Sequence, residues 1–187
     1  MVIGMIAPTN YFPPFELVKS IVSLRKWYEF VIIQSHSVPD NRNRVWDIML
    51  AKYPDEDLLF IDTDTVFVDS DVQKIEQHLK TYDIITGLYV LANEVPAIFR
   101  RGETDYEFIK PELGLFKIDA CGAGFLGISK RTYRKLPKNP FSNFHEGEII
   151  HGEDVSFCFR AGKAGIPIFC DSSLKLGHVR TWVFKPE

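Results

Sequence analysis

The sequence has few cysteines, no long apolar run and no signal-peptide pattern. Cys121, Cys158 and Cys170 lack metal-type spacing and are odd in number, so we expect buried free thiols, with a Cys158–Cys170 disulfide as the alternative. No apolar stretch approaches the ~20 residues of a membrane-spanning helix, which excludes a transmembrane segment. The N-terminus lacks the charged segment, apolar segment and cleavage site of a signal peptide, so we expect a cytoplasmic protein.

Basic charge is also lacking, because the formal net charge is -3. Nucleic-acid-binding proteins usually carry a strong basic excess, so we expect no nucleic-acid partner. Aromatic residues, in contrast, make up 13% of the chain and suit both core packing and stacking on bases or sugars. The length of 187 residues fits one domain with a sizeable core.

Short apolar runs alternate with helical patterns along the chain. Strands are expected at 2–7, 30–33, 58–61, 83–90, 123–128 and 166–170. Helices are expected at 15–27, 40–52, 130–136 and 153–162, with a short helix capped by Ser70 or Asp71. The segment 91–117 is expected to be divided into short strands and loops, and 137–152 is expected to be a long loop. The β-α-β-α-β opening predicts an α/β protein with a mostly parallel, twisted sheet and helices on both faces.

An acidic triplet, Asp62-Thr63-Asp64, directly follows the apolar run at 58–61. Open parallel sheets bind ligands at the carboxyl ends of their strands, and residues i and i+2 of an extended chain share a face. Both carboxylates can therefore point into one crevice, where Mg²⁺ or Mn²⁺ would also take phosphate oxygens from a ligand. The alternative is that the two acids only end a strand and cap a turn.

Two further acids, Glu153 and Asp154, open the last expected helix. Acids at a helix N-terminus interact favourably with the helix dipole, which is the structural explanation. The functional explanation is that one of the two acids is a general base, which the flexible Gly152 before it allows to point into a cleft. His178 follows the last strand, where an imidazole can complete a metal shell, although a lone histidine is more often only packed or solvated.

This succession of elements and motifs resembles the GT-A fold of glycosyltransferases, especially the family 2-like inverting enzymes. The likeness is strongest at DEDLLFIDTD (55–64), AGFLGI (123–128) and GEDVSFCFRA (152–161), and it covers most of the chain. The small size is also similar to compact viral transferases of this fold, which would place the protein in a host cytoplasm. The resemblance implies a single Rossmann-like GT-A domain over 1–187, with a nucleotide-binding half at 1–90 and an acceptor and catalytic half at 91–187.

The resemblance also implies roles for individual residues. The base is assigned to Asp154, with Glu153 in reserve. The ligands of Mn²⁺ or Mg²⁺ are Asp64, Asp62 and His178. The residues implied for nucleotide-sugar binding are Pro8, Thr9, Asn10, Asn41, Arg42, Asn43, Arg44, Asp62, Thr63, Gly122, Ala123 and Gly124.

Together these roles predict an enzyme of the hexosyltransferase class. It would move a sugar from a nucleotide-diphosphate donor to a hydroxyl of a glycan, lipid or protein acceptor, with inversion. A sugar nucleotidyltransferase is one alternative, but such enzymes usually carry a Gly-rich basic loop where this chain has Ala7-Pro8-Thr9-Asn10. A non-catalytic nucleotide-sugar-binding module is the other, and it would need no base. The sequence ends nine residues after His178, so little room is expected for the acceptor-binding region of larger members.

Overall fold

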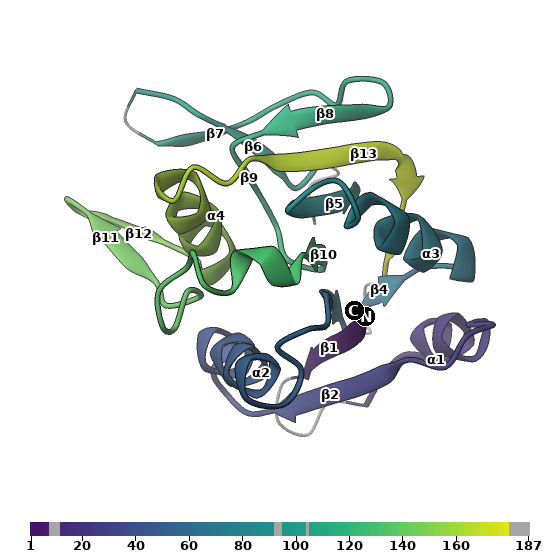
Figure 1. The fold of residues 1–187 in the computed structure, drawn as a ribbon. Helices are drawn as coiled ribbons and strands as arrows, with labels where there is room; N and C mark the ends of the chain where they lie inside the picture. The colour runs from purple at the N-terminus through teal and green to yellow at the C-terminus, as the bar shows by residue number, and fades with distance from the viewer. Residues whose placement is uncertain (8–11, 92–94, 104, 180–187) are drawn as a thin grey trace, which may run out of the picture.

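The computed structural model describes residues 1–7, 12–91, 95–103 and 105–179. Its centre is a seven-stranded sheet in the order β2-β1-β3-β10-β5-β13-β8 (Figure 1). The strands are β1 (Val2–Ala7), β2 (Glu29–Gln34), β3 (Leu58–Asp62), β5 (Ile84–Leu88), β8 (Leu115–Ile118), β10 (Phe125–Ile128) and β13 (Ile168–Lys175). β10 runs antiparallel to both β3 and β5, and β8 runs antiparallel to β13. The other five share one direction, so the sheet is mainly parallel, as expected.

Helices cover both faces of this sheet (Figure 1). They are α1 (Phe15–Val22), α2 (Val38–Lys52), α3 (Asp69–His78) and α4 (Glu153–Lys163). On β3, Leu58 and Phe60 pack into the core beneath α2 and α4, whereas Leu59 and Ile61 pack into the core beneath α1 and α3. Because alternate residues of a strand point to opposite faces, this double burial explains the unbroken apolar run of β3.

Two helices differ from the sequence-based prediction at their ends. α2 begins before residue 40, because the Ser37 side chain accepts a hydrogen bond from the Asp40 N–H at 3.3 Å and caps the helix. α1 ends at Val22 rather than at 27. Beyond it, the Ser23 hydroxyl donates to the Ser20 carbonyl at 2.7 Å, and such side-chain bonds compete with the helical ladder.

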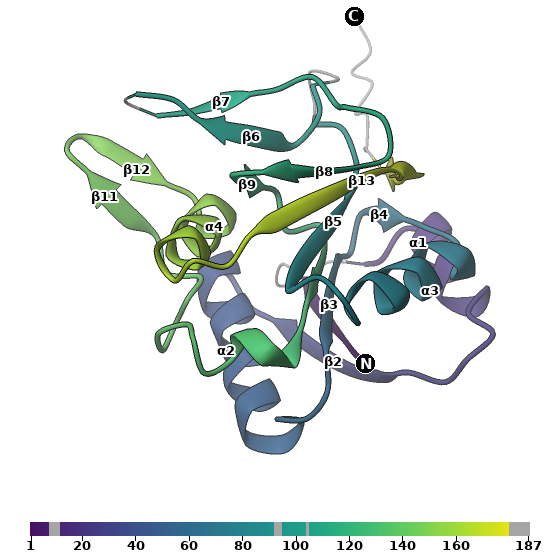
Figure 2. The ribbon, with the colours of Figure 1, turned by 45° about the horizontal axis from the view of Figure 1, so that its top comes forward.

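The later half of the chain adds smaller elements. They are β4 (Thr65–Val66), β6 (Ile98–Arg101), β7 (Tyr106–Phe108), β9 (Ala120–Cys121), β11 (Phe144–Glu146), β12 (Ile149–His151) and β14 (Gly177–His178). The loop expected at 137–152 therefore contains a hairpin, β11–β12, which projects on the same side as the β6–β7 hairpin (Figure 2). The helix expected at 130–136 is only a 3₁₀ turn, Lys130–Thr132, because the Thr132 hydroxyl donates to the Ser129 carbonyl and closes it.

The cysteines and the predicted cap of the short helix have the structural roles expected of them. All three thiols are free and buried. Asp71 accepts a hydrogen bond from the Val68 N–H at 2.9 Å and caps α3. Within the described ranges, no helix is both long and apolar enough to cross a membrane.

Candidate functional site

The triplet lies at the carboxyl end of β3, where Asp62 forms an ion pair with Arg42 of α2. The Nη2 of Arg42 donates to the two carboxylate oxygens of Asp62 at 2.9 and 3.1 Å. The Arg42 side chain is only 2% exposed, against 29% for Asp62. Burial raises the pKa of Asp62, and the Arg42 charge counteracts that shift. Burial lowers the pKa of Arg42, but Asp62 and Glu153 outweigh it, so the guanidinium pKa is raised and the cation persists.

Arg42 also connects Asp62 to two other parts of the site. Its Nε donates to Glu153 at 3.2 Å, and its Nη1 donates to the Ala123 carbonyl at 3.4 Å. The guanidinium lies over the Phe60 ring, 5.2 Å from the ring centroid. One buried cation therefore fixes the end of β3, the start of α4 and the segment before β10 relative to α2.

Asp64, the last acid of the triplet, faces His178. The Nε2 of His178 lies 3.0 Å from Asp64 Oδ2, and its Nδ1 lies 3.0 Å from the Val90 carbonyl. A carbonyl only accepts hydrogen bonds, so Nδ1 is assigned as the donor and Nε2 is the nitrogen turned to the carboxylate. Nε2 and Asp64 Oδ2 are then close enough to bind one cation together.

The two acids at the start of α4 differ in their surroundings. Glu153 accepts from Arg42, whereas Asp154 accepts from the Val155 N–H at 2.7 Å. Burial, followed by the neighbouring Glu153 charge, raises the pKa of Asp154 to about 6. A carboxylate with a pKa near neutrality is a better proton acceptor than an ordinary aspartate.

Tyr89 packs against the glycines that precede β10. Its hydroxyl accepts from the Gly124 N–H at 3.3 Å, and a Cβ on Gly124 would lie 3.3 Å from that oxygen and 3.4 Å from Asp62 Oδ2. A Cβ on Gly122 would overlap the Tyr89 hydroxyl outright. Both glycines are therefore required by the close approach of Tyr89. Burial raises the pKa of Tyr89 well above its ordinary value, and the Asp62 charge adds to that shift.

A pocket of about 190 Å³ opens beside these groups. It is lined by Ile6, Ala7, Val38, Asn41, Arg42, Asp62, Thr63, Asp64 and Glu153. Three carboxylates and one guanidinium give the lining a net negative charge, so a diphosphate would be repelled unless a cation accompanied it. Among the described residues, no group of three or more His, Cys, Asp or Glu side chains forms a metal site. A cation here would therefore take its remaining ligands from the substrate or from water.

The structure brings most of the predicted site residues together, with some exceptions. Asn41 lines the pocket, where its side chain bonds the Ser35 hydroxyl at 2.6 Å. Asn43 instead accepts from the Phe141 N–H at 2.9 Å, and Arg44 is exposed beside a separate pocket. The predicted residues 8–10 lie outside the described ranges.

Two features of the site were not apparent from the sequence. Tyr89 was not among the predicted residues, and Arg42 was expected to bind the nucleotide rather than to pair with Asp62. The pairing depends on the burial of Arg42 on an early turn of α2. That burial depends on how α2 packs and cannot be read from the sequence.

No protein-family model and no curated protein matches the sequence. Solved structures do match it. The viral protein A197 from STIV is 25% identical, with a TM-score of 0.73, over 97% of this chain and 87% of that chain. A putative nucleotide-diphospho-sugar transferase from Desulfovibrio desulfuricans G20 is 10% identical, with a TM-score of 0.51, over 90% of this chain and 78% of that chain. These likenesses point to a GT-A-like fold, whereas membership of family 2 and inversion stay predictions.

Proposed function

We propose that this chain is a metal-dependent glycosyltransferase that moves a sugar from a nucleotide-diphosphate donor to an acceptor hydroxyl. The observation that carries the proposal is the Asp64–His178 pair at 3.0 Å, beside a pocket lined by carboxylates at the ends of β1 and β3. The fold shared with a putative nucleotide-diphospho-sugar transferase is consistent with it.

The donor atoms at this pair fit a divalent cation. A carboxylate oxygen suits both Mg²⁺ and Mn²⁺, and the imidazole nitrogen favours Mn²⁺. His178 is held in place by its Nδ1–H bond to Val90, an arrangement common for metal-binding histidines. When bound, the cation would supply neutralisation of the charge that develops on the departing diphosphate. Asp62 is paired with Arg42, so we propose that it orients the part of the site that lies beside the ribose of the donor.

The chain's own residues would perform the proton transfer. Asp154 would accept the proton of the acceptor hydroxyl while that oxygen bonds to the anomeric carbon and the bond from this carbon to the diphosphate oxygen breaks. Attack from the face opposite the leaving group gives the inversion that the family resemblance implies. Arg42 would keep Glu153 in an ion pair, so that Glu153 does not act as the base. It would also fix the positions of Asp62 and the start of α4 relative to each other.

The test is a screen of nucleotide sugars against the purified chain, with and without Mn²⁺. We expect one donor class to raise the unfolding temperature only with the cation, because ligands that bind the folded state stabilise it. Asp64→Ala should abolish this shift and the metal-dependent hydrolysis of the donor. Unchanged hydrolysis and transfer in that variant would refute the assignment of Asp64.

The same samples distinguish the two alternatives. Release of pyrophosphate from a nucleoside triphosphate and a sugar phosphate would indicate a sugar nucleotidyltransferase. A donor-dependent thermal shift without turnover over all acceptors tested would indicate a non-catalytic binding module.

A further inference from the structure

Helix α1 exposes an apolar stripe on the side opposite its buried face. Leu17 is 1% exposed and packs into the core, as does the partly buried Ile21. Phe15, Val18 and Val22 are 66%, 41% and 78% exposed. Their spacing of three and four residues places them on one side of the helix. A helix that is apolar on two sides is normally covered on both sides by other parts of the protein or by a partner. The exposed stripe therefore predicts a binding partner.

Aromatic residues are also exposed beyond both ends of α1. Phe12 is 89% exposed and Trp27 is 98% exposed. Val22 and Trp27 also line a pocket of about 330 Å³ with Leu24 and Tyr28. The α1 surface is defined by Phe12, Phe15, Val18, Val22 and Trp27. Several exposed apolar residues on and beside one helix indicate an interaction site more often than singly scattered ones do.

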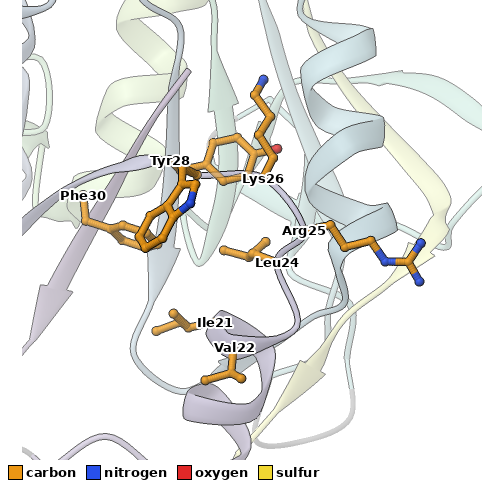
Figure 3. A pocket seen from close by; sticks show the side chains of 8 residues that line it. Ile21, Val22, Leu24, Arg25, Lys26, Tyr28 and Phe30 are labelled. Carbon is orange, nitrogen blue, oxygen red and sulfur yellow. The ribbon is translucent and has the colours of Figure 1, made fainter.

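Basic residues lie within and beside the α1 surface, although the whole chain is acidic. Residues 12–28 contain Lys19, Arg25 and Lys26 with one acid, Glu16, for a net charge of +2, which leaves -5 for the rest of the chain. Lys26 pairs with Glu76 of α3 at 2.6 Å. Within the described part of the chain, Lys19 and Arg25 form no ion pair. The Arg25 side chain extends away from the apolar side chains of the pocket (Figure 3), whereas Lys26 Nζ lies over the Tyr28 ring, 5.3 Å from its centroid.

We propose that the α1 surface docks on an anionic lipid bilayer. Exposed tryptophan and phenylalanine beside lysine and arginine are typical of segments that lie in the membrane interface. α1 has eight residues, so it would lie along the bilayer and not span it. Two copies of the chain meeting through this surface would bring Lys19 and Arg25 of one copy close to those of the other, which disfavours a symmetric dimer.

This orientation would hold the candidate site close to the lipid surface. The underside of α1 packs on the segment that follows the acidic triplet, because the Ser20 hydroxyl accepts from the Phe67 N–H at 3.0 Å. This bond connects α1 to the segment that follows the carboxyl end of β3.

The test is flotation of the full chain with vesicles of phosphatidylcholine alone and of phosphatidylcholine mixed with phosphatidylglycerol. We expect binding to the mixed vesicles that weakens with salt, and a blue shift of tryptophan emission that Trp27→Phe reduces. Trp27→Ser should weaken binding about tenfold, and Lys19→Gln with Arg25→Gln about fivefold for each cation.

Leu113→Ser and Lys110→Gln are the matched controls, since Leu113 is 100% exposed and Lys110 is exposed on a distant loop. Both should bind vesicles as the unaltered chain does. Equal thermal unfolding of all the variants will show that only the surface has changed. The proposal is overturned if the chain binds neither vesicle, if the controls lose binding as much as the α1 variants do, or if Trp27→Ser abolishes a dimer and leaves vesicle binding unchanged.

Discussion

Arg42 and Asp62 are joined through one guanidinium nitrogen that contacts both carboxylate oxygens, at 2.9 and 3.1 Å. This contact explains why the first acid of the triplet differs from the third. Asp62 belongs to a buried network with Glu153 and the Ala123 carbonyl, whereas Asp64 is 42% exposed, lines the pocket and faces His178.

Arg42→Met should therefore destabilise the fold as well as the site. Breaking a buried pair costs about 3–5 kcal/mol, and the partial exposure of Asp62 reduces the expected loss to about 2–4 kcal/mol. The measurement is the free energy of unfolding in urea. Arg44→Met, an exposed arginine on the same helix, should change stability by less than about 0.5 kcal/mol. Equal effects of the two substitutions would show that the pair contributes nothing.

Asp64→Ala and His178→Ala should each remove the response to Mn²⁺. Loss of a group that binds the metal weakens transition-state stabilisation, so we expect transfer to fall about 100-fold or more with Asp64→Ala. The measurements are sugar transfer and the Mn²⁺-dependent shift in unfolding temperature, and a chelator should reproduce the loss. Asp47→Ala, which removes an exposed acid of α2, is the control and should retain both responses.

The activity should decrease below a pH of about 6, because Asp154 with a pKa of about 6 is then protonated and cannot accept a proton. The acid limb of kcat/KM against pH is the measurement. Asp154→Asn should abolish transfer and leave donor affinity nearly unchanged. Loss of donor affinity in this variant would instead indicate a role in nucleotide binding.

The same shift predicts a change in stability of defined sign. The pKa of Asp154 is about 6 in the folded chain against an ordinary value of 3.8, so between these values the folded state binds more protons than the unfolded state. Stability therefore decreases as the pH rises through this window. Asp154→Asn lacks this loss and should be more stable than the unaltered chain at pH 7, by about 1–2 kcal/mol. The difference in unfolding free energy should shrink as the pH falls from 6 to 4.

Gly122→Ala should displace Tyr89, because the added Cβ overlaps its hydroxyl. Overpacking of this kind costs about 1–3 kcal/mol, and we expect reduced donor binding from the shifted loop. Unfolding free energy and donor affinity are the measurements. Gly162→Ala in α4 is the matched control, since a Cβ there meets nothing within 4 Å and should leave stability unchanged or raise it by about 0.5–1 kcal/mol.

The fold class and the position of the acidic triplet were predictable from the sequence. The burial of β3 on both faces follows from its continuous apolar run, and the position of Asp62 and Asp64 beside a pocket at the carboxyl end of β3 follows from the rule that open parallel sheets bind ligands there. The short extent of α1 was not predictable, because the chain beyond the turn at Ser23 is held by a tertiary contact, the bond from the Arg25 N–H to Asp69, 44 residues away.

The sequence by itself determined the order of elements, the apolar faces and the chemical groups available, because periodicity and residue type are local properties. Only the tertiary structure decided the partners of those groups. Arg42 contacts Asp62 and Glu153, which are 20 and 111 residues away, and Asp64 faces His178 across 114 residues. Burial then set the pKa of Asp154, since desolvation depends on what surrounds a carboxyl and not on its neighbours in the chain.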